Sequence, residues 1–126
     1  MRKILVVDDE QDVEELFRQI FRGEIRRGEM DLQFVLSAQS ALDYIQGLQP
    51  FDLVLVLTDI NMPGQSGFDL LRKIREKFPE LQVFMIWAYD DTTNFEEAKK
   101  LGANDFIPKP VDFIRLKESI AKVLLN

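Results

Sequence analysis

Acidic, amide and lysine side chains follow three short apolar runs of this sequence. They are Asp8 and Asp9 after KILVV, Asp59 and Asn61 after DLVLVLT, and Lys109 after DFIP. Several carboxylates that lie close together resist joint ionisation, but a divalent cation such as Mg²⁺ prefers oxygen ligands of this kind. A lysine supplies a compact positive charge that suits a phosphate. The set predicts a phosphoryl-transfer site in which an aspartate can act as the nucleophile.

Each aspartate taken alone has a simpler interpretation. Aspartate is common at turns and as the first residue before a helix, where it only caps backbone N–H groups. The prediction of a site therefore rests on the whole set of acids together with the lysine.

The elements that would bring this set together follow from apolar periodicity. Apolar runs predict strands at residues 3–7, 32–36, 52–58, 81–87 and 105–108, and helical spacing predicts helices near 13–21, 38–46, 67–78, 92–101 and 113–124. Strands that are apolar on both faces belong in a parallel sheet covered by helices on both sides. With right-handed crossovers this is an α/β three-layer sandwich. The carboxyl ends of its strands meet at one edge, where the acids and the lysine lie.

Composition narrows the classes of function. The chain has 126 residues with 46% apolar and 30% charged residues, which fits one folded domain. It has no cysteine and no histidine, so a metal must be a hard ion held by oxygen, which means Mg²⁺, Mn²⁺ or Ca²⁺. Mg²⁺ or Mn²⁺ is the expected ion at a phosphoryl-transfer site. The net charge of −6 argues against direct nucleic-acid binding. No apolar run is long enough to cross a membrane, and we expect a cytoplasmic protein.

One segment is basic, with Arg18, Arg22, Arg26 and Arg27 interspersed with glutamates. A solvated helix face is one interpretation of this pattern, and a contact with a partner is the other. The sequence favours the solvated face.

The segments KILVVDDE, DINMPGQSG and LGANDFIPKP resemble the three signature segments of the response-regulator receiver domain of two-component signalling. Their order and spacing agree over essentially the whole chain. The resemblance implies a flavodoxin-like (βα)₅ fold with strand order 2-1-3-4-5. It also implies that residues 1–126 form a single receiver domain.

The resemblance further implies a role for each residue of the set. Asp59 matches the phosphoacceptor, and Lys109 matches the lysine that contacts the phosphoryl group, with a cis bond to the proline after it. Asp8 and Asp9 match the acidic pair at the metal, with Asp9 as the direct ligand and Asp8 acting through water. Asn61 matches the residue whose backbone carbonyl completes the protein ligands.

Partners are likewise implied by the resemblance. The phosphoryl donor would be a histidine kinase or a histidine phosphotransfer protein. A downstream protein or an output domain would bind the surface formed by the helix near 92–101, the strand 105–108 and the last helix. The domain would be a monomer or a dimer linked to phosphorylation, with weak self-catalysed transfer and hydrolysis rather than the activity of an enzyme. The sequence stops just after the last helix, so we expect either a stand-alone protein or the receiver of a longer one.

Trp87 departs from the family pattern, because it stands where receivers have serine or threonine. The resemblance implies that this hydroxyl binds the new phosphoryl group and that an aromatic residue, here Phe106, then swings inward. An indole N–H stands farther from the backbone than a hydroxyl. The indole would crowd the pocket or be forced outward into the space that Phe106 needs, and we expect impaired coupling between phosphorylation and the output surface. The simpler interpretation is that Trp87 packs outward and leaves the metal site intact. Ala88 matches the small residue that keeps access to Asp59 open.

The third strand also departs from the pattern, with extra residues between Asp52 and Asp59. Two extra residues would preserve the alternation of side chains, so either a longer strand or a bulge outside the site would be tolerated. The segment RGEIRRGEMD is expected to lengthen the first helix or its exit loop.

Two alternatives to a phosphoacceptor switch remain. A receiver-like interaction module that no longer switches is favoured only by Trp87. A small flavin-binding protein of similar fold would want a phosphate-binding loop after the first strand. The acidic sequence at that position argues against the flavin protein.

Overall fold

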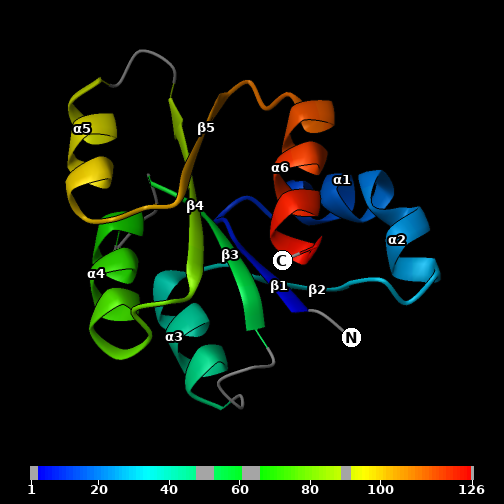
Figure 1. Cartoon of the computed structure of the whole chain (residues 1–126), viewed down its shortest axis with the longest axis horizontal. Helices are drawn as coiled ribbons and strands as arrows, with labels where there is room; N and C mark the ends of the chain where they lie inside the picture. The colour runs from blue at the N-terminus through cyan, green and yellow to red at the C-terminus, as the bar shows by residue number, and fades with distance from the viewer. Residues whose placement is uncertain (1–2, 48–52, 61–65, 89–91, 126) are drawn as a thin grey trace.

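A computed structural model describes residues 3–47, 53–60, 66–88 and 92–125 of the chain (Figure 1). Its strands are β1 (Lys3–Val7), β2 (Asp31–Val35), β3 (Leu53–Asp59), β4 (Gln82–Ala88) and β5 (Asp105–Lys109). Its helices are α1 (Asp12–Ile20), α2 (Arg22–Arg26), α3 (Ala38–Gln46), α4 (Gly67–Lys77), α5 (Thr92–Lys100) and α6 (Phe113–Leu125). None of these helices, within the described ranges, has the length and apolar character needed to span a bilayer.

The five strands form one parallel sheet in the order β2-β1-β3-β4-β5. This confirms the predicted fold class and strand order. Helices α3, α4 and α5 lie on one side of the sheet, and α1, α2 and α6 lie on the other (Figure 1). Because every strand runs in the same direction, the ends of β1, β3 and β5 that carry polar residues lie at one edge.

Alternation along the strands divides the core into two clusters, as the period of two requires. One cluster combines Leu5, Val7, Val56, Val83 and Met85 with residues of α3, α4 and α5. The other combines Ile4, Val6, Leu55, Leu57, Phe84 and Ile86 with residues of α1 and α6. Burial on both faces explains why these strands are continuously apolar, and it makes the sheet a firm base for the polar edge.

The helix α2 was not predicted as a separate element, so the expectation of five helices was wrong. The backbone of Phe21 leaves the helical region, with φ −99° and ψ 17°, and this ends α1 before a further short helix begins. Phe21 and Met30, on either side of α2, are buried. Glu24 of α2 forms an ion pair of 3.3 Å with Lys117 of α6. The segment therefore folds back onto α6 instead of continuing α1.

The extra length of the third strand is taken up by an irregularity at its beginning. Lys3 pairs with Leu53, whereas Ile4 pairs with Leu55, so one residue of β3 has no partner in the β1 register. From Leu55 onward the pairing with β1 and β4 is regular up to Asp59. This irregularity lies at the end of β3 away from the acidic edge, where the sequence allowed either a longer strand or a bulge.

Candidate functional site

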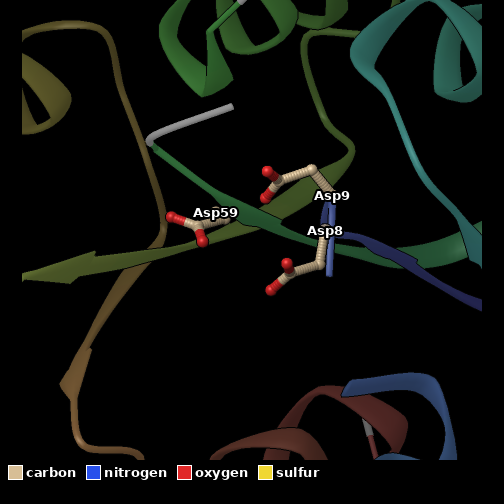
Figure 2. Close-up of side chains that lie close together, drawn as sticks. All are labelled: Asp8, Asp9 and Asp59. Carbon is tan, nitrogen blue, oxygen red and sulfur yellow. The ribbon is translucent and has the colours of Figure 1, made fainter. Parts of the chain in front are cut away.

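Three aspartates from two neighbouring strands meet at the polar edge of the sheet. Asp8 and Asp9 follow β1, and Asp59 is the last residue of β3 (Figure 2). One carboxylate oxygen of each lies within 4.8 Å of the others. Asp8 and Asp59 are buried, with 4% and 2% of their surface exposed, and Asp9 is exposed. The site is therefore a half-open acidic pocket whose oxygen donors suit a hard divalent cation.

Backbone hydrogen bonds hold these aspartates in place. The N–H of Asp8 donates to the carbonyl of Val35 in β2, and the N–H of Ile60 donates to the carbonyl of Ile86 in β4. The carboxylate of Asp8 also accepts a hydrogen bond of 2.9 Å from the N–H of Glu10. The sheet thus fixes the backbone on which the acidic side chains stand.

Lys109 completes the pocket from the end of β5. Its Nζ lies 2.7 Å from Oδ2 of Asp59, and its side chain is 40% exposed. The peptide bond between Lys109 and Pro110 is cis, as expected from the resemblance. The lysine brings one positive charge against the buried acid and leaves the remaining carboxylates in excess.

Burial and the surrounding negative charge both affect the protonation of Asp8. Burial is the largest cause of a rise in its pKa from 3.8 to about 6. The hydrogen bond from the N–H of Glu10 lowers this pKa, and the charge of Asp59 raises it. Smaller effects come from Lys109, which lowers the pKa, and from Asp9, which raises it. Asp8 therefore carries its charge at a cost that a bound cation would remove.

The pKa of Lys109 is shifted upward. Partial burial alone lowers it, but the hydrogen bond to Asp59 and the negative charges of Asp59, Asp8 and Glu10 outweigh that effect. The lysine therefore stays protonated and available to a phosphate at neutral pH.

Gly67, at the start of α4, allows this helix to approach the backbone of the site. Its N–H donates to the carbonyl of Ile60 at 2.9 Å. A Cβ at this position would overlap the carbonyl oxygen of Asp59 and lie 2.9 Å from Cα of Ile60. Ser66 and Asp69 cap the helix reciprocally and fix its beginning.

Replacing Gly67 with alanine is expected to lower the free energy of unfolding by about 1–3 kcal/mol, because backbone atoms would have to move. Urea unfolding measures this change. Gly47→Ala is the matched control, since its nearest contact would be an ordinary 3.7 Å, and we expect a change within about 0.5 kcal/mol. Equal effects of the two substitutions would contradict the close approach of α4 to Asp59.

Trp87 lies next to the end of β4 and packs on the side of the sheet covered by α5. Its ring stacks on Phe95 of α5 with centroids 4.8 Å apart and planes inclined by 32°. Phe95 in turn meets Phe106 of β5 edge-on, also at 4.8 Å. The indole and Phe106 are partly buried against the same core cluster. Phe95 thus contacts both Trp87 and Phe106, the two residues that the sequence predicted to affect switching.

The structure does not fully describe two of the predicted site residues, Asn61 and Ala88. Asn61 lies outside the described residues. The backbone of Ala88 pairs with Lys109 in the register of β4 and β5, whereas its side chain is not among those described.

Sequence reasoning missed two residues at this edge. Phe95 was assigned only to a helix, although it is the large apolar residue at the start of a mostly charged segment, which is a signal that it packs inward. Thr58 is completely buried beside Asp59, and its hydroxyl donates to the carbonyl of Asp59. A polar residue at the end of an apolar strand was the available signal for Thr58.

The arginine-rich segment lies on the surface of α1 and α2. Its four arginines are exposed. Arg18 forms an ion pair with Glu14, and Arg27 forms ion pairs with Glu24 and Glu29. These contacts agree with a solvated helix face.

Comparison with known proteins agrees with this architecture. The response regulator receiver domain family matches residues 4–121. The response regulator protein PilR of Pseudomonas aeruginosa is 39% identical over 123 residues, which are 98% of this chain and 26% of PilR. The chemotaxis protein CheY-3 of Vibrio cholerae is 35% identical, over 96% of this chain and 90% of CheY-3.

Solved structures give the same result. The crystal structure of the receiver domain of NtrX from Brucella abortus matches with a TM-score of 0.82 and 34% identity, and 98% of each chain is covered. This chain spans about a quarter of the length of PilR but most of the length of CheY-3. The family match covers β1 to α6, including both strand ends that carry the three aspartates. The chain belongs to the response regulator receiver domain family, whose members are signalling modules.

Proposed function

We propose that this domain is a phosphoacceptor switch in which Asp59 receives a phosphoryl group from a phosphohistidine. The donor would be a histidine kinase or a histidine phosphotransfer protein. The observation that carries the proposal is the buried carboxylate of Asp59 beside two further aspartates, with the Nζ of Lys109 at 2.7 Å. We further propose that residues 1–126 act as one receiver domain in the cytoplasm.

The transfer exchanges one bond to phosphorus for another. A carboxylate oxygen of Asp59 attacks phosphorus, the bond from phosphorus to the histidine nitrogen breaks, and the histidine leaves with the electron pair. Lys109, held at the pocket by its contact with Asp59, is placed to contact the transferred oxygens. Attack by water on the aspartyl phosphate then releases phosphate and restores the carboxylate. Positioning and charge neutralisation account for almost all of the rate acceleration in phosphoryl transfer.

The pocket fits Mg²⁺ or Mn²⁺. The fit rests on three carboxylate oxygens within 4.8 Å of one another. It also rests on the raised pKa of Asp8, which is caused mainly by burial and in addition by the charge of Asp59. Asp9, Asp59 and the backbone carbonyl of Asn61 would be direct ligands, and Asp8 would act through water. When bound, the ion neutralises charge on the carboxylates and on the transferred phosphoryl group.

Turnover of a small acyl phosphate tests this function. We expect inorganic phosphate to be released in the presence of Mg²⁺ and to fall to the uncatalysed rate when the metal is chelated. The Asp59→Asn variant should show the uncatalysed rate in both conditions. Release that is equal in wild type and Asp59→Asn would refute the proposed role of Asp59.

Output would use the surface formed by α5, β5 and α6, which would bind a downstream protein or an output domain. We propose that Trp87 weakens the response of this surface. An indole stacked on Phe95 does not offer the hydroxyl that receivers use to hold the phosphoryl group. Phosphorylation would then displace the end of β4 less than it does when the hydroxyl is present.

The variant Trp87→Thr should therefore respond more strongly than wild type. We expect the change in hydrogen exchange of β5 and α6 upon phosphorylation to be at least about threefold larger in the variant, which corresponds to a gained hydrogen bond. The Trp87→Phe variant keeps a ring without a hydroxyl and should behave like wild type. An equal response of all three proteins would show that Trp87 does not limit coupling.

A receiver that no longer switches and acts only as an interaction module is the second candidate. The stacking of Trp87 on Phe95 is the observation that favours it. The two functions separate in the turnover experiment, because an interaction module would bind partners without consuming the acyl phosphate.

A further inference from the structure

Phe95 is the large apolar side chain in the described part of helix α5. The described side chains of this helix are those of residues 95–100. Ala98 is fully buried but small. An ion pair of 3.4 Å between Glu97 and Arg72 of α4 lies at the surface, where such pairs contribute little. Leu101, directly after α5, is also partly buried against the core, so it holds the end of the helix. The contacts of Phe95 therefore decide how firmly the beginning of α5 is held.

These contacts reach two different strands. The ring of Phe95 lies 4.8 Å from the ring of Trp87 in β4 and 4.8 Å from the ring of Phe106 in β5. Lys99, one turn further along α5, places its Nζ 5.5 Å from the centroid of the same ring. A ring packed in this way between two others stabilises one position of the helix, because offset and edge-on pairs are favourable.

The end of β4 that carries Trp87 is also tied to the phosphorylation site. The carbonyl of Ile86 accepts the N–H of Ile60, the residue after Asp59. Ala88 pairs with Lys109 in the register of β4 and β5. Trp87 therefore stands between two points that contact the pocket. A phosphoryl group on Asp59 that draws Lys109 and this strand end toward itself would change the geometry of the ring stack.

We propose that Phe95 is a positioning residue that holds α5 in the position it has in the unphosphorylated protein. Phosphorylation of Asp59 must then disrupt the ring contacts among Trp87, Phe95 and Phe106, which we call the clamp. This inference rests on the proposed function of Asp59 and extends it to the regulation of the same site. By reciprocity, loosening the clamp makes the site accept a phosphoryl group more readily.

The variant Phe95→Leu tests the clamp, because leucine keeps an apolar side chain and favours a helix while removing the ring. Phe78→Leu is the matched control. Phe78 is also partly buried against the same core cluster, at the end of α4. Two measurements are made on each protein. The first is hydrogen exchange of α5 without ligand, and the second is the beryllofluoride concentration that half-saturates the protein at fixed, saturating Mg²⁺.

We expect hydrogen exchange of α5 to be about threefold to tenfold faster in Phe95→Leu than in wild type, because the free energy of one lost aromatic pair corresponds to a factor of that size. We expect half-saturation at a beryllofluoride concentration lower by a similar factor, with unchanged Mg²⁺ affinity. The Phe78→Leu variant should match wild type in both respects. A purely structural role for Phe95 would reduce stability without improving beryllofluoride binding.

Unchanged or weaker beryllofluoride binding by Phe95→Leu would overturn the clamp. If wild type binds Mg²⁺ but no beryllofluoride, the proposed function of Asp59 fails separately. The clamp on phosphorylation is then overturned as well. Faster exchange of α5 in Phe95→Leu would show only that Phe95 holds the helix, and equal exchange in all three proteins would overturn that role too.

Discussion

Replacing Lys109 with alanine is expected to slow phosphoryl transfer to Asp59 by about 10²- to 10³-fold, the usual cost of losing one positioned charge or donor at a reacting centre. The reason is the position of its Nζ, 2.7 Å from Asp59 Oδ2 in a pocket that holds two further carboxylates. Without the lysine, negative charge on the acids faces negative charge on the phosphoryl group. The measurement is the rate of phosphorylation by a small acyl phosphate at saturating Mg²⁺.

The control for this experiment is Lys122→Ala. Lys122 is exposed in the last turns of α6, and its removal changes the net charge by the same amount. We expect its rate to stay within about twofold of wild type, because exposed charges at a distance are screened by salt. A Lys109→Ala variant that transfers as fast as Lys122→Ala would show that the contact with Asp59 is only structural.

The second large effect is expected from Asp8→Asn, which should stabilise the metal-free protein at pH 7.5 by about 2–3 kcal/mol. Folding raises the pKa of Asp8 from 3.8 to about 6, mainly through burial. Ionised Asp8 therefore costs free energy in the folded protein, and a neutral amide removes this cost. The amide oxygen can still accept the hydrogen bond of the Glu10 N–H.

The same substitution should weaken Mg²⁺ binding by about 10- to 100-fold, the typical loss for a group that supports a metal through water. Thermal or urea unfolding and a Mg²⁺ titration measure the two effects. Asp43→Asn, at an exposed position of α3, is the control and should change neither. Destabilisation of the metal-free protein by Asp8→Asn would contradict the assigned charge state.

The raised pKa of Asp8 also fixes the sign of a pH effect. Between pH 3.8 and about 6 the folded protein binds more protons at Asp8 than the unfolded chain does. The contribution of Asp8 to stability therefore falls as pH rises through this window, by up to about 3 kcal/mol, and stays constant above it. The difference in stability between wild type and Asp8→Asn, followed from pH 4 to pH 7.5 without metal, reports this contribution.

Much of this site was predictable because parallel strands bring their carboxyl ends to one edge. The members of this set, from Asp8 to Lys109, lie up to 101 positions apart in the chain, yet apolar runs placed each at a strand end. The strand order itself came from resemblance, since periodicity does not state which strands are neighbours. The extra length of β3 was visible in the sequence, which left a longer strand and a bulge open. The pairing of Lys3 with Leu53 and of Ile4 with Leu55 places an irregularity at the start of the strand.

Other features depended on packing that the sequence does not encode locally. Whether the segment after Phe21 would extend α1 or form a new helix depended on contacts with α6, among them that of Glu24 with Lys117. The position of the Trp87 ring depended on Phe95, which lies outside the signature segments. The close approach of Gly67 to Asp59 required the position of α4. Such contacts become visible only when the helices are placed against the sheet.

The central claim is that Asp59 becomes covalently phosphorylated, and intact mass tests it most directly. Wild type and Asp59→Asn would be incubated with a small acyl phosphate and Mg²⁺ and then measured without delay. The account predicts that wild type gains the mass of one phosphoryl group and that Asp59→Asn gains none. A wild-type protein that binds Mg²⁺ and gains no mass, or an Asp59→Asn variant that gains the same mass, would contradict it.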